Sequence, residues 1–290
     1  MSVVSLVRKQ VEKPWGRHHL WPGFDDIPAD RAAVGEIWFE TPPGLGVEDP
    51  DLMIKYLFTS EKLSVQVHPG DADARARGQR RGKSEAWQIL SAAPHAAIAL
   101  GTVRPMTRTE LRGAAEDGSI QNLIDWRPVK AGDFYYSPAG TVHAIGPGLV
   151  LVEIQQNVDL TYRLYDYGRP RELHLDDGVA VAQPVPYVAP FEPSDLAPGR
   201  RLQHAGGAFV VERWTASLAG TLAASPVRPV WLVPLGGRGR VGNKAIGAGG
   251  VWLAHASVPF ALAPGIDMLV AYSGGEVNGA LITQDMADPT

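Results

Sequence analysis

Four polar side chains in the first half of the chain have the types and spacing of a metal site. Gln66 and His68 alternate with valines in a strand-like run, so both side chains point to one face. Glu85 enters the next strand-like run, after a loop rich in arginine and aspartate. His143 ends a segment with the pattern Gly-x5-Pro-x-Gly-x2-His, in which the proline and the glycines favour a tight turn. Together these side chains offer nitrogen and oxygen donors, which suit Zn²⁺ and also Fe²⁺ or Mn²⁺.

Each of these segments alone has a simpler interpretation. Gln66 and His68 fit the polar face of a half-solvated antiparallel sheet. The sequence Lys83-Ser84-Glu85 fits a solvated strand edge, since charged side chains are mostly exposed. The three segments in this order, however, predict a metal site, because a metal would satisfy polar groups that are costly to bury unpaired.

The elements that must position these donors are predominantly strands. Short apolar or alternating runs bounded by glycine and proline recur along the sequence. So many strand-like runs at short spacing predict a β-barrel or β-sandwich. One stretch differs, because Thr107 and Glu110 have the spacing of a helix capping box. We therefore expect a small helical excursion at about residues 104–127.

A proline-rich segment divides the sequence into two parts. Five prolines within residues 184–200 exclude a helix or a central strand there. We therefore expect a catalytic domain over 1–183, a linker over 184–200 and a small all-β domain over 201–290. The later histidines lack a Gly-Pro-Gly-His context, so we expect the second domain to be metal-free.

The composition restricts the class of protein. A hydrophobic fraction of 45% over 290 residues is sufficient for a large core. The absence of cysteine excludes disulfides, zinc-thiolate sites and thiol nucleophiles. A net charge of -4 argues against a nucleic-acid partner. With no membrane-spanning apolar run and no signal peptide, we expect a cytoplasmic protein that does not bind membranes.

Several motifs resemble those of a known family. The segment ending at His143 resembles the second sequence motif of the cupin superfamily. Further segments are similar to the short bacterial type of class I mannose-6-phosphate isomerases, from about residue 11 to 180: EKPWG (12–16), GEIW (35–38), SVQVHPGD (64–71), KSEAW (83–87) and the run 151–174. The chain departs from the family pattern at Gly70, where aspartate is frequent, and at Arg17, where a second glycine is common.

The resemblance implies the fold, the reaction and the cofactor. It implies two cupin-like β-barrel or jelly-roll domains, with the helical excursion in the first. It also implies a zinc-dependent aldose–ketose isomerase that interconverts mannose 6-phosphate and fructose 6-phosphate through an enediolate, with one Zn²⁺ per chain. Carried over by motif, the zinc ligands are Gln66, His68, Glu85 and His143. The family's active-site arginine corresponds to Arg163.

The reaction requires a base that moves a proton between adjacent carbons. A guanidinium stays protonated, so we assign Arg163 to stabilising the enediolate or orienting the substrate. Lys83 is a candidate base if a neighbouring Zn²⁺ lowers its pKa, and another group remains an alternative. The substrate phosphate needs cationic or amide donors. The candidates near the motifs are Lys83, Ser84 and Arg169, together with Arg171.

Two other functions are compatible with a cupin fold. Another metal-dependent cupin enzyme, such as a dioxygenase, would have a three-histidine or facial-triad ligand set, which the Gln66–His68 pairing does not match. A non-enzymatic sugar-binding module would not need Lys83 and Arg163 beside the metal donors. The isomerase is therefore the favoured interpretation. We expect a phosphosugar substrate and a monomer or weak homodimer.

Overall fold

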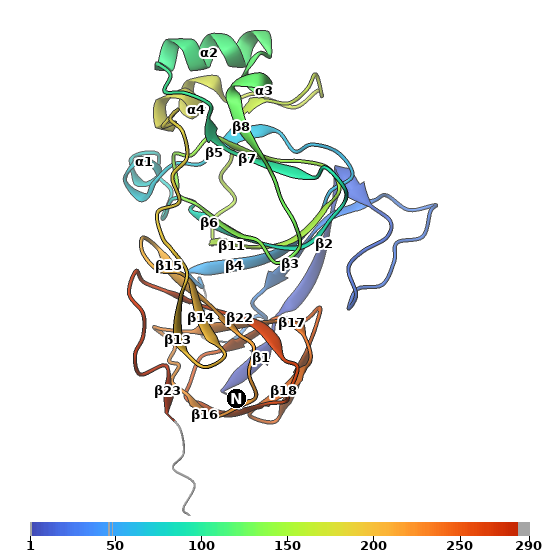
Figure 1. Cartoon of the computed structure of the whole chain (residues 1–290), viewed down its shortest axis with the longest axis vertical. Coiled ribbons are helices and arrows are strands. Elements are labelled where there is room, and N and C mark those ends of the chain that lie inside the picture. Colours follow the sequence, from blue (N-terminus) through green and yellow to red (C-terminus); the bar gives the residue numbers. More distant parts are fainter. Residues whose placement is uncertain (1, 46, 48, 284–290) are drawn as a thin grey trace, which may run out of the picture.

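The alternating segments of the sequence form antiparallel strands, which assemble into four sheets (Figure 1). The computed structural model describes residues 2–45, 47 and 49–283. Two sheets form the first barrel. The six-stranded sheet contains, in spatial order, β2 (Val7–Arg17), β3 (Val34–Glu40), β4 (Leu52–Phe58), β11 (Leu149–Gln156), β6 (Glu85–Ala92) and β9 (Phe134–Ser137). Facing it are β12 (Tyr162–Tyr165), β5 (Val65–Val67), β10 (His143–Ile145), β7 (Ala97–Thr102) and β8 (Ile124–Pro128).

The other two sheets form a second barrel below the first in Figure 1. Its larger sheet contains β1 (Val3–Ser5), β20 (Trp252–Ala254), β17 (Val230–Gly236), β22 (Asp267–Ser273), β15 (Phe209–Trp214), β14 (Arg200–His204) and β13 (Ser194–Ala197). Its smaller sheet contains β19 (Lys244–Gly247), β18 (Arg238–Val241), β21 (Val258–Leu262), β16 (Leu218–Leu222) and β23 (Ile282–Thr283). The expected mainly β fold with two cupin-like barrels is confirmed.

Four apolar layers hold the stack of sheets together. One fills the first barrel and another fills the second. A third lies between the barrels, where the outer face of the six-stranded sheet packs against the seven-stranded sheet through residues such as Tyr56, Ile154 and Trp231. The fourth lies between the five-stranded sheet of the first barrel and the helices. Both sheets of the first barrel are therefore covered on their outer faces, which fixes the inner faces as the walls of a single interior.

The helices cover the far side of the first barrel (Figure 1). They are α2 (Arg108–Asp117), α3 (Ile120–Leu123) and α4 (Leu175–Val181), whereas α1 (Asp71–Ala76) lies beside the barrel. The capping box is present, with Thr107 and Glu110 bonded reciprocally at the start of α2. The helical excursion is thus confirmed, although its end differs from the expected 104–127. From Ile124 the chain returns to strand β8, because Ile124 and Trp126 pack in the layer beneath the helices.

The two ends of the expected first domain show how the barrels are connected. The first strand, β1, pairs with β20, so residues near the N-terminus join the sheet of the second barrel although the sequence places them in 1–183. This pairing leaves Val3 buried in the core of the second barrel. Within the proline-rich segment lies β13, at the sheet edge, where prolines are tolerated. The division at 184–200 stays a prediction.

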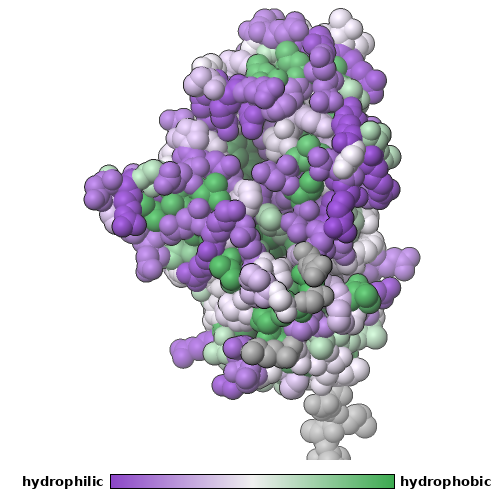
Figure 2. All heavy atoms as spheres, turned by 180° about the vertical axis from the view of Figure 1, so that it is seen from behind, coloured by the Kyte–Doolittle hydropathy of each residue, from purple (hydrophilic) through white to green (hydrophobic). Residues whose placement is uncertain are grey.

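The surface of the molecule is mainly hydrophilic on the face opposite to that of Figure 1, with hydrophobic side chains in separate small patches (Figure 2). Within the described residues, no helix is both long and apolar enough to cross a membrane. The large apolar surfaces are instead those buried between the sheets.

Candidate active site

Strand alternation turns the candidate donors into the first barrel. Val65 and Val67 pack in the layer beneath the helices, so Gln66 on β5 faces the opposite way, into the barrel. The neighbouring strands β10 and β12 place His143 and Arg163 directly opposite Gln66 in register. The expected shared face of Gln66 and His68 is therefore observed. Pairing of three strands gathers residues that are almost 100 positions apart in the sequence.

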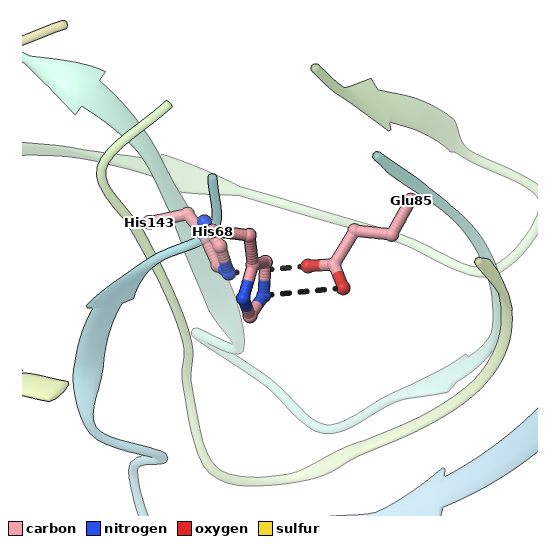
Figure 3. Close-up of side chains that lie close together, drawn as sticks. All are labelled: His68, Glu85 and His143. Carbon is pink, nitrogen blue, oxygen red and sulfur yellow. Dashed lines mark ion pairs between the residues drawn. The ribbon is translucent and has the colours of Figure 1, made fainter. Parts of the chain in front are cut away.

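Glu85 approaches these donors from the opposite wall of the barrel. It begins strand β6 of the six-stranded sheet, and its carboxylate points toward both imidazoles (Figure 3). Oε1 lies 3.1 Å from Nε2 of His143, and Oε2 lies 3.4 Å from Nε2 of His68. Donor atoms of His68, Glu85 and His143 all lie within 4.8 Å of one another, and all three residues are buried. This arrangement can hold a metal ion.

Hydrogen bonds orient both imidazoles toward the same point. Nδ1 of His68 donates to the carbonyl oxygen of Leu160 at 2.8 Å. Nδ1 of His143 donates to the carbonyl oxygen of Thr141 at 2.9 Å. Each bond fixes the proton on Nδ1 and leaves the lone pair of Nε2 facing Glu85, which is how metal-binding histidines are usually held. Burial lowers the pKa of His68 to about 3, so its imidazole is neutral, as a ligand must be.

The charge of Glu85 is the strongest indication of a cation at this point. The side chain is fully buried, and within the described residues neither carboxylate oxygen receives a hydrogen bond of good geometry. Burial alone would raise the pKa of Glu85, but the positive charge of Lys83 holds it well below its ordinary value. Nζ of Lys83 lies 2.8 Å from Oε2. An ionised carboxylate with free lone pairs, beside Nε2 of two histidines, matches the donor set of a divalent metal.

Gln66 lies beside these three residues. Its Nε2 lies 3.2 Å from Nε2 of His143, and its Oε1 accepts a hydrogen bond from Ser64 at 3.1 Å. A rotation of the terminal amide by half a turn exchanges the positions of its oxygen and nitrogen, so that the oxygen faces Nε2 of His143. The nitrogen then faces the hydroxyl group of Ser64, which can accept a hydrogen bond as well as donate one. The role of Gln66 as a fourth ligand stays a prediction.

A polar pocket of about 300 Å³ lies beside this cluster. Gln66 and Lys83 line it, and they contact the three metal donors behind them. Also in its wall are Arg163, Arg171 and His174, which provide cationic or hydrogen-bonding groups. Nη1 of Arg163 donates to the carbonyl oxygen of Glu172, while its buried Nε has no partner among the described residues. The pocket therefore joins the metal donors to a cationic wall.

Three buried charged residues of the pocket were missed by the sequence reasoning. Glu36, Lys55 and Glu153 are all buried and line the pocket. Nζ of Lys55 lies 3.7 Å from Glu153 and 3.9 Å from Glu36. The pKa of Glu153 is raised, mainly by burial and by the charge of Glu85. A signal was available, because Lys55 and Glu153 each interrupt an otherwise apolar strand, and such a charge on a buried strand indicates a functional group.

Two of the expected substrate-binding residues do not line this pocket. Oγ of Ser84 instead accepts a hydrogen bond from the backbone N–H of Ala139. Arg169 donates to the carbonyl oxygen of Lys62 and lies within 3.4 Å of Asp166. Both side chains are thus engaged within the protein. The neighbouring Arg171 lines the pocket in their place, held by two hydrogen bonds of 2.6 and 2.7 Å to Asp166.

Curated relatives match part of the chain. A segment of 136 residues is 42% identical to mannose-6-phosphate isomerase of Streptococcus mutans, and it represents 45% of this chain and 43% of the relative. A segment of 140 residues is 44% identical to mannose-6-phosphate isomerase ManA of Bacillus subtilis, covering 46% and 44% of the two chains. These matches span less than half of the length of either relative. No protein-family model matches the chain.

Solved structures match almost the whole chain. A mannose 6-phosphate isomerase from Bacillus subtilis superimposes with a TM-score of 0.80 at 27% identity, over 93% of this chain and 99% of that one. A zinc-bound mannose 6-phosphate isomerase gives a TM-score of 0.72 over 94% of this chain and 100% of that one. Its identity is only 12%, so this second likeness concerns the fold alone. The resemblance expected from the motifs is confirmed: over these segments the chain is similar in sequence to mannose-6-phosphate isomerases, and it has their cupin-type fold.

Proposed function

We propose that this protein is a zinc-dependent isomerase that interconverts mannose 6-phosphate and fructose 6-phosphate. The observation that carries the proposal is the convergence of His68, Glu85 and His143 behind a polar pocket that also contains Lys83 and Arg163. The names of the curated relatives, which match at 42% and 44% identity, support the same reaction.

The metal would be held by His68, Glu85 and His143, with Gln66 as the fourth ligand. Bound there, Zn²⁺ supplies Lewis-acid stabilisation of negative charge on a substrate oxygen. The residues of the chain prepare this position before the metal binds. The carbonyl groups of Leu160 and Thr141 set both imidazole tautomers. Lys83 keeps the Glu85 carboxylate ionised.

We assign the proton transfer between the two substrate carbons to Glu153. Its carboxyl group lines the pocket, accepts a hydrogen bond from Nε1 of Trp87 at 3.1 Å and has a raised pKa because it is buried. A carboxylate whose pKa is raised toward neutrality can take a proton from one carbon and return it to the other. The expected Lys83 base is less suitable in the chain as it stands. Although burial alone lowers the pKa of Lys83, Glu85 and Glu153 raise it above its ordinary value.

Lys83 and Arg163 then have electrostatic roles. Both are cations at the pocket wall, and an enediolate carries negative charge while the proton is on the base. The ammonium group of Lys83 lies close to the metal donors, so we place it beside the reacting carbons. Arg163 pairs with the Gln66 position in register, which puts its guanidinium on the same side of the barrel.

We assign the phosphate group of the substrate to Arg171, which lines the pocket. Arg171 uses Nε and one Nη for Asp166, so its remaining N–H groups are available to an anion. Asp166 is buried, and its two hydrogen bonds set the orientation of the guanidinium plane. This arrangement favours a phosphorylated sugar over a free one.

The remaining expectations complete the proposal. The net charge of -4 supports a protein without a nucleic-acid partner. We further propose a cytoplasmic enzyme that acts as a monomer or weak homodimer and does not bind membranes. Size-exclusion chromatography with light scattering measures the oligomeric state directly.

The first prediction concerns activity and metal. Protein loaded with one equivalent of zinc forms fructose 6-phosphate from mannose 6-phosphate in a coupled assay, whereas chelation abolishes the activity and added zinc restores it. The His143→Ala variant loses activity because one donor is missing, and its zinc affinity falls. The His174→Ala variant is the matched control and retains zinc. A zinc-loaded protein without activity on mannose 6-phosphate would contradict the proposed reaction.

The second prediction concerns the base. Glu153→Gln keeps the shape of the side chain but cannot accept the proton, so kcat falls by about 10²- to 10⁴-fold while bound zinc is unchanged. Incorporation of solvent deuterium at C2 of the sugar phosphate falls in parallel. Glu36→Gln removes another buried pocket carboxylate and serves as the control, with proton exchange retained. If Glu153→Gln exchanges protons normally and Lys83→Met does not, Lys83 is the base.

The third prediction concerns the phosphate. Arg171→Gln raises KM for mannose 6-phosphate by roughly 10- to 100-fold, because a charge-assisted contact is lost, and changes kcat little. Arg169→Gln alters the other arginine bonded to Asp166 and is expected to change KM by less than about 3-fold. Steady-state kinetics on the two variants decide between the arginines. If Arg169→Gln raises KM more than Arg171→Gln does, Arg169 binds the phosphate, as expected from the sequence.

A further inference from the structure

Three separate segments supply the metal donors, and a small group of hydrogen bonds connects all three. The segments are 66–71 with His68, 82–85 with Glu85, and 138–143 with His143. We propose that Asp71, Gln156 and Ser84 are positioning residues that set the distance between these segments and thereby the affinity for the metal. This inference rests on the metal site of the proposed function, and it is independent of which sugar the enzyme uses.

Asp71 connects the first segment to the second. Its Oδ1 accepts hydrogen bonds from the backbone N–H of Gly82 at 2.8 Å and from Nε2 of Gln156 at 3.0 Å. The backbones of the two segments are also in direct contact, since a Cβ on Gly82 would lie 2.5 Å from the carbonyl oxygen of Pro69. The N–H of Lys83 donates to that same carbonyl group. His68 and Glu85 are therefore joined through only a few residues on either side.

Gln156 connects the second segment to the end of β11. The side-chain Oε1 of Gln156 accepts a hydrogen bond of 2.9 Å from the backbone N–H of Ser84. The backbone N–H of Gln156 donates to the carbonyl oxygen of Ser84. Both ends of the Gln156 amide are thus used, one by Ser84 and one by Asp71. The side chain is buried, so losing either partner would leave a polar group unsatisfied.

Ser84 connects the second segment to the third. Its Oγ accepts a hydrogen bond of 3.2 Å from the backbone N–H of Ala139. The next residue, Gly140, donates its N–H to the carbonyl oxygen of His68 at 2.8 Å, which joins the third segment to the first. Ser84 directly precedes Glu85, so a shift of Ser84 moves the Glu85 carboxylate.

Together these hydrogen bonds link the three segments pairwise in a closed circuit. None of them involves an atom that would bind the metal. A metal ion accepts only a narrow range of ligand distances, so residues that fix its ligands influence affinity by about 10- to 100-fold. A purely structural role is the alternative for Asp71, because it also occupies the first turn of α1 and pairs with Arg75 at 3.2 Å. The two roles differ in what they change: the zinc affinity, or only the stability of the metal-free chain.

The test measures the zinc dissociation constant by competition with a chromophoric chelator, beside the thermal stability of the metal-free protein. We expect Asp71→Ala and Gln156→Leu to weaken zinc binding by about 10- to 100-fold. Asp71→Asn keeps an oxygen acceptor and should restore binding to within about 5-fold of the wild type. The matched control is Asp73→Ala, which removes another first-turn carboxylate of α1 outside the circuit.

The outcomes separate the possible failures. Zinc affinities of Asp71→Ala and Gln156→Leu equal to that of the wild type would overturn the inference, even if both variants melt at lower temperature. An equal loss of affinity in Asp73→Ala would also overturn it, because the effect would then come from the helix. If Gln156→Leu does not fold, Asp71→Ala and Ser84→Ala carry the test. A wild-type protein that binds zinc but lacks isomerase activity would contradict the reaction alone, whereas one that binds no zinc would overturn both proposals.

Discussion

An ionised carboxylate buried inside a β-barrel is the constraint on which the site depends. Glu85 has no exposed surface, and moving a carboxylate out of water costs several kcal/mol unless cationic partners surround it. Lys83 provides one such partner at 2.8 Å. The lone pairs that remain on the carboxylate face Nε2 of His68 and Nε2 of His143. A bound divalent cation would accept these lone pairs, and its position would be defined by the same three side chains.

The stacked architecture explains how such a site can be rigid. The six-stranded sheet that carries Glu85 has its outer face buried against the second barrel, while the sheet that carries Gln66 and His143 has its outer face covered by helices. Neither wall can move outward without exposing apolar surface to water. The second barrel, whose own interior is apolar, therefore contributes to the site by supporting one wall. This is a structural role for a domain in which the sequence predicts no metal.

Sequence patterns predicted the structure correctly where it depends on residues close together in the sequence. Alternation placed Gln66 and His68 on one face, and the capping box placed the start of α2. The motif resemblance identified Glu85 and His143 as partners, although strand spacing alone could not bring together residues so distant in the sequence. What the sequence did not reveal depends on non-local pairing. Strand β1 pairs with β20, far away in the sequence. Ser84 and Arg169 form hydrogen bonds within the protein, and these depend on contacts that exist only in the folded chain. Lys55 and Glu153 were detectable in principle, as isolated charges in apolar strands.

We propose that one zinc ion is held by His68, Glu85 and His143 beside the pocket. Anomalous diffraction at the zinc absorption edge, from crystals of the zinc-loaded protein, locates the ion. We expect one strong peak per chain, about 2.0–2.2 Å from Nε2 of both histidines and from a carboxylate oxygen of Glu85, with the amide oxygen of Gln66 as the fourth ligand. A peak at other residues, or bonding through Nδ1 of either histidine, would contradict it.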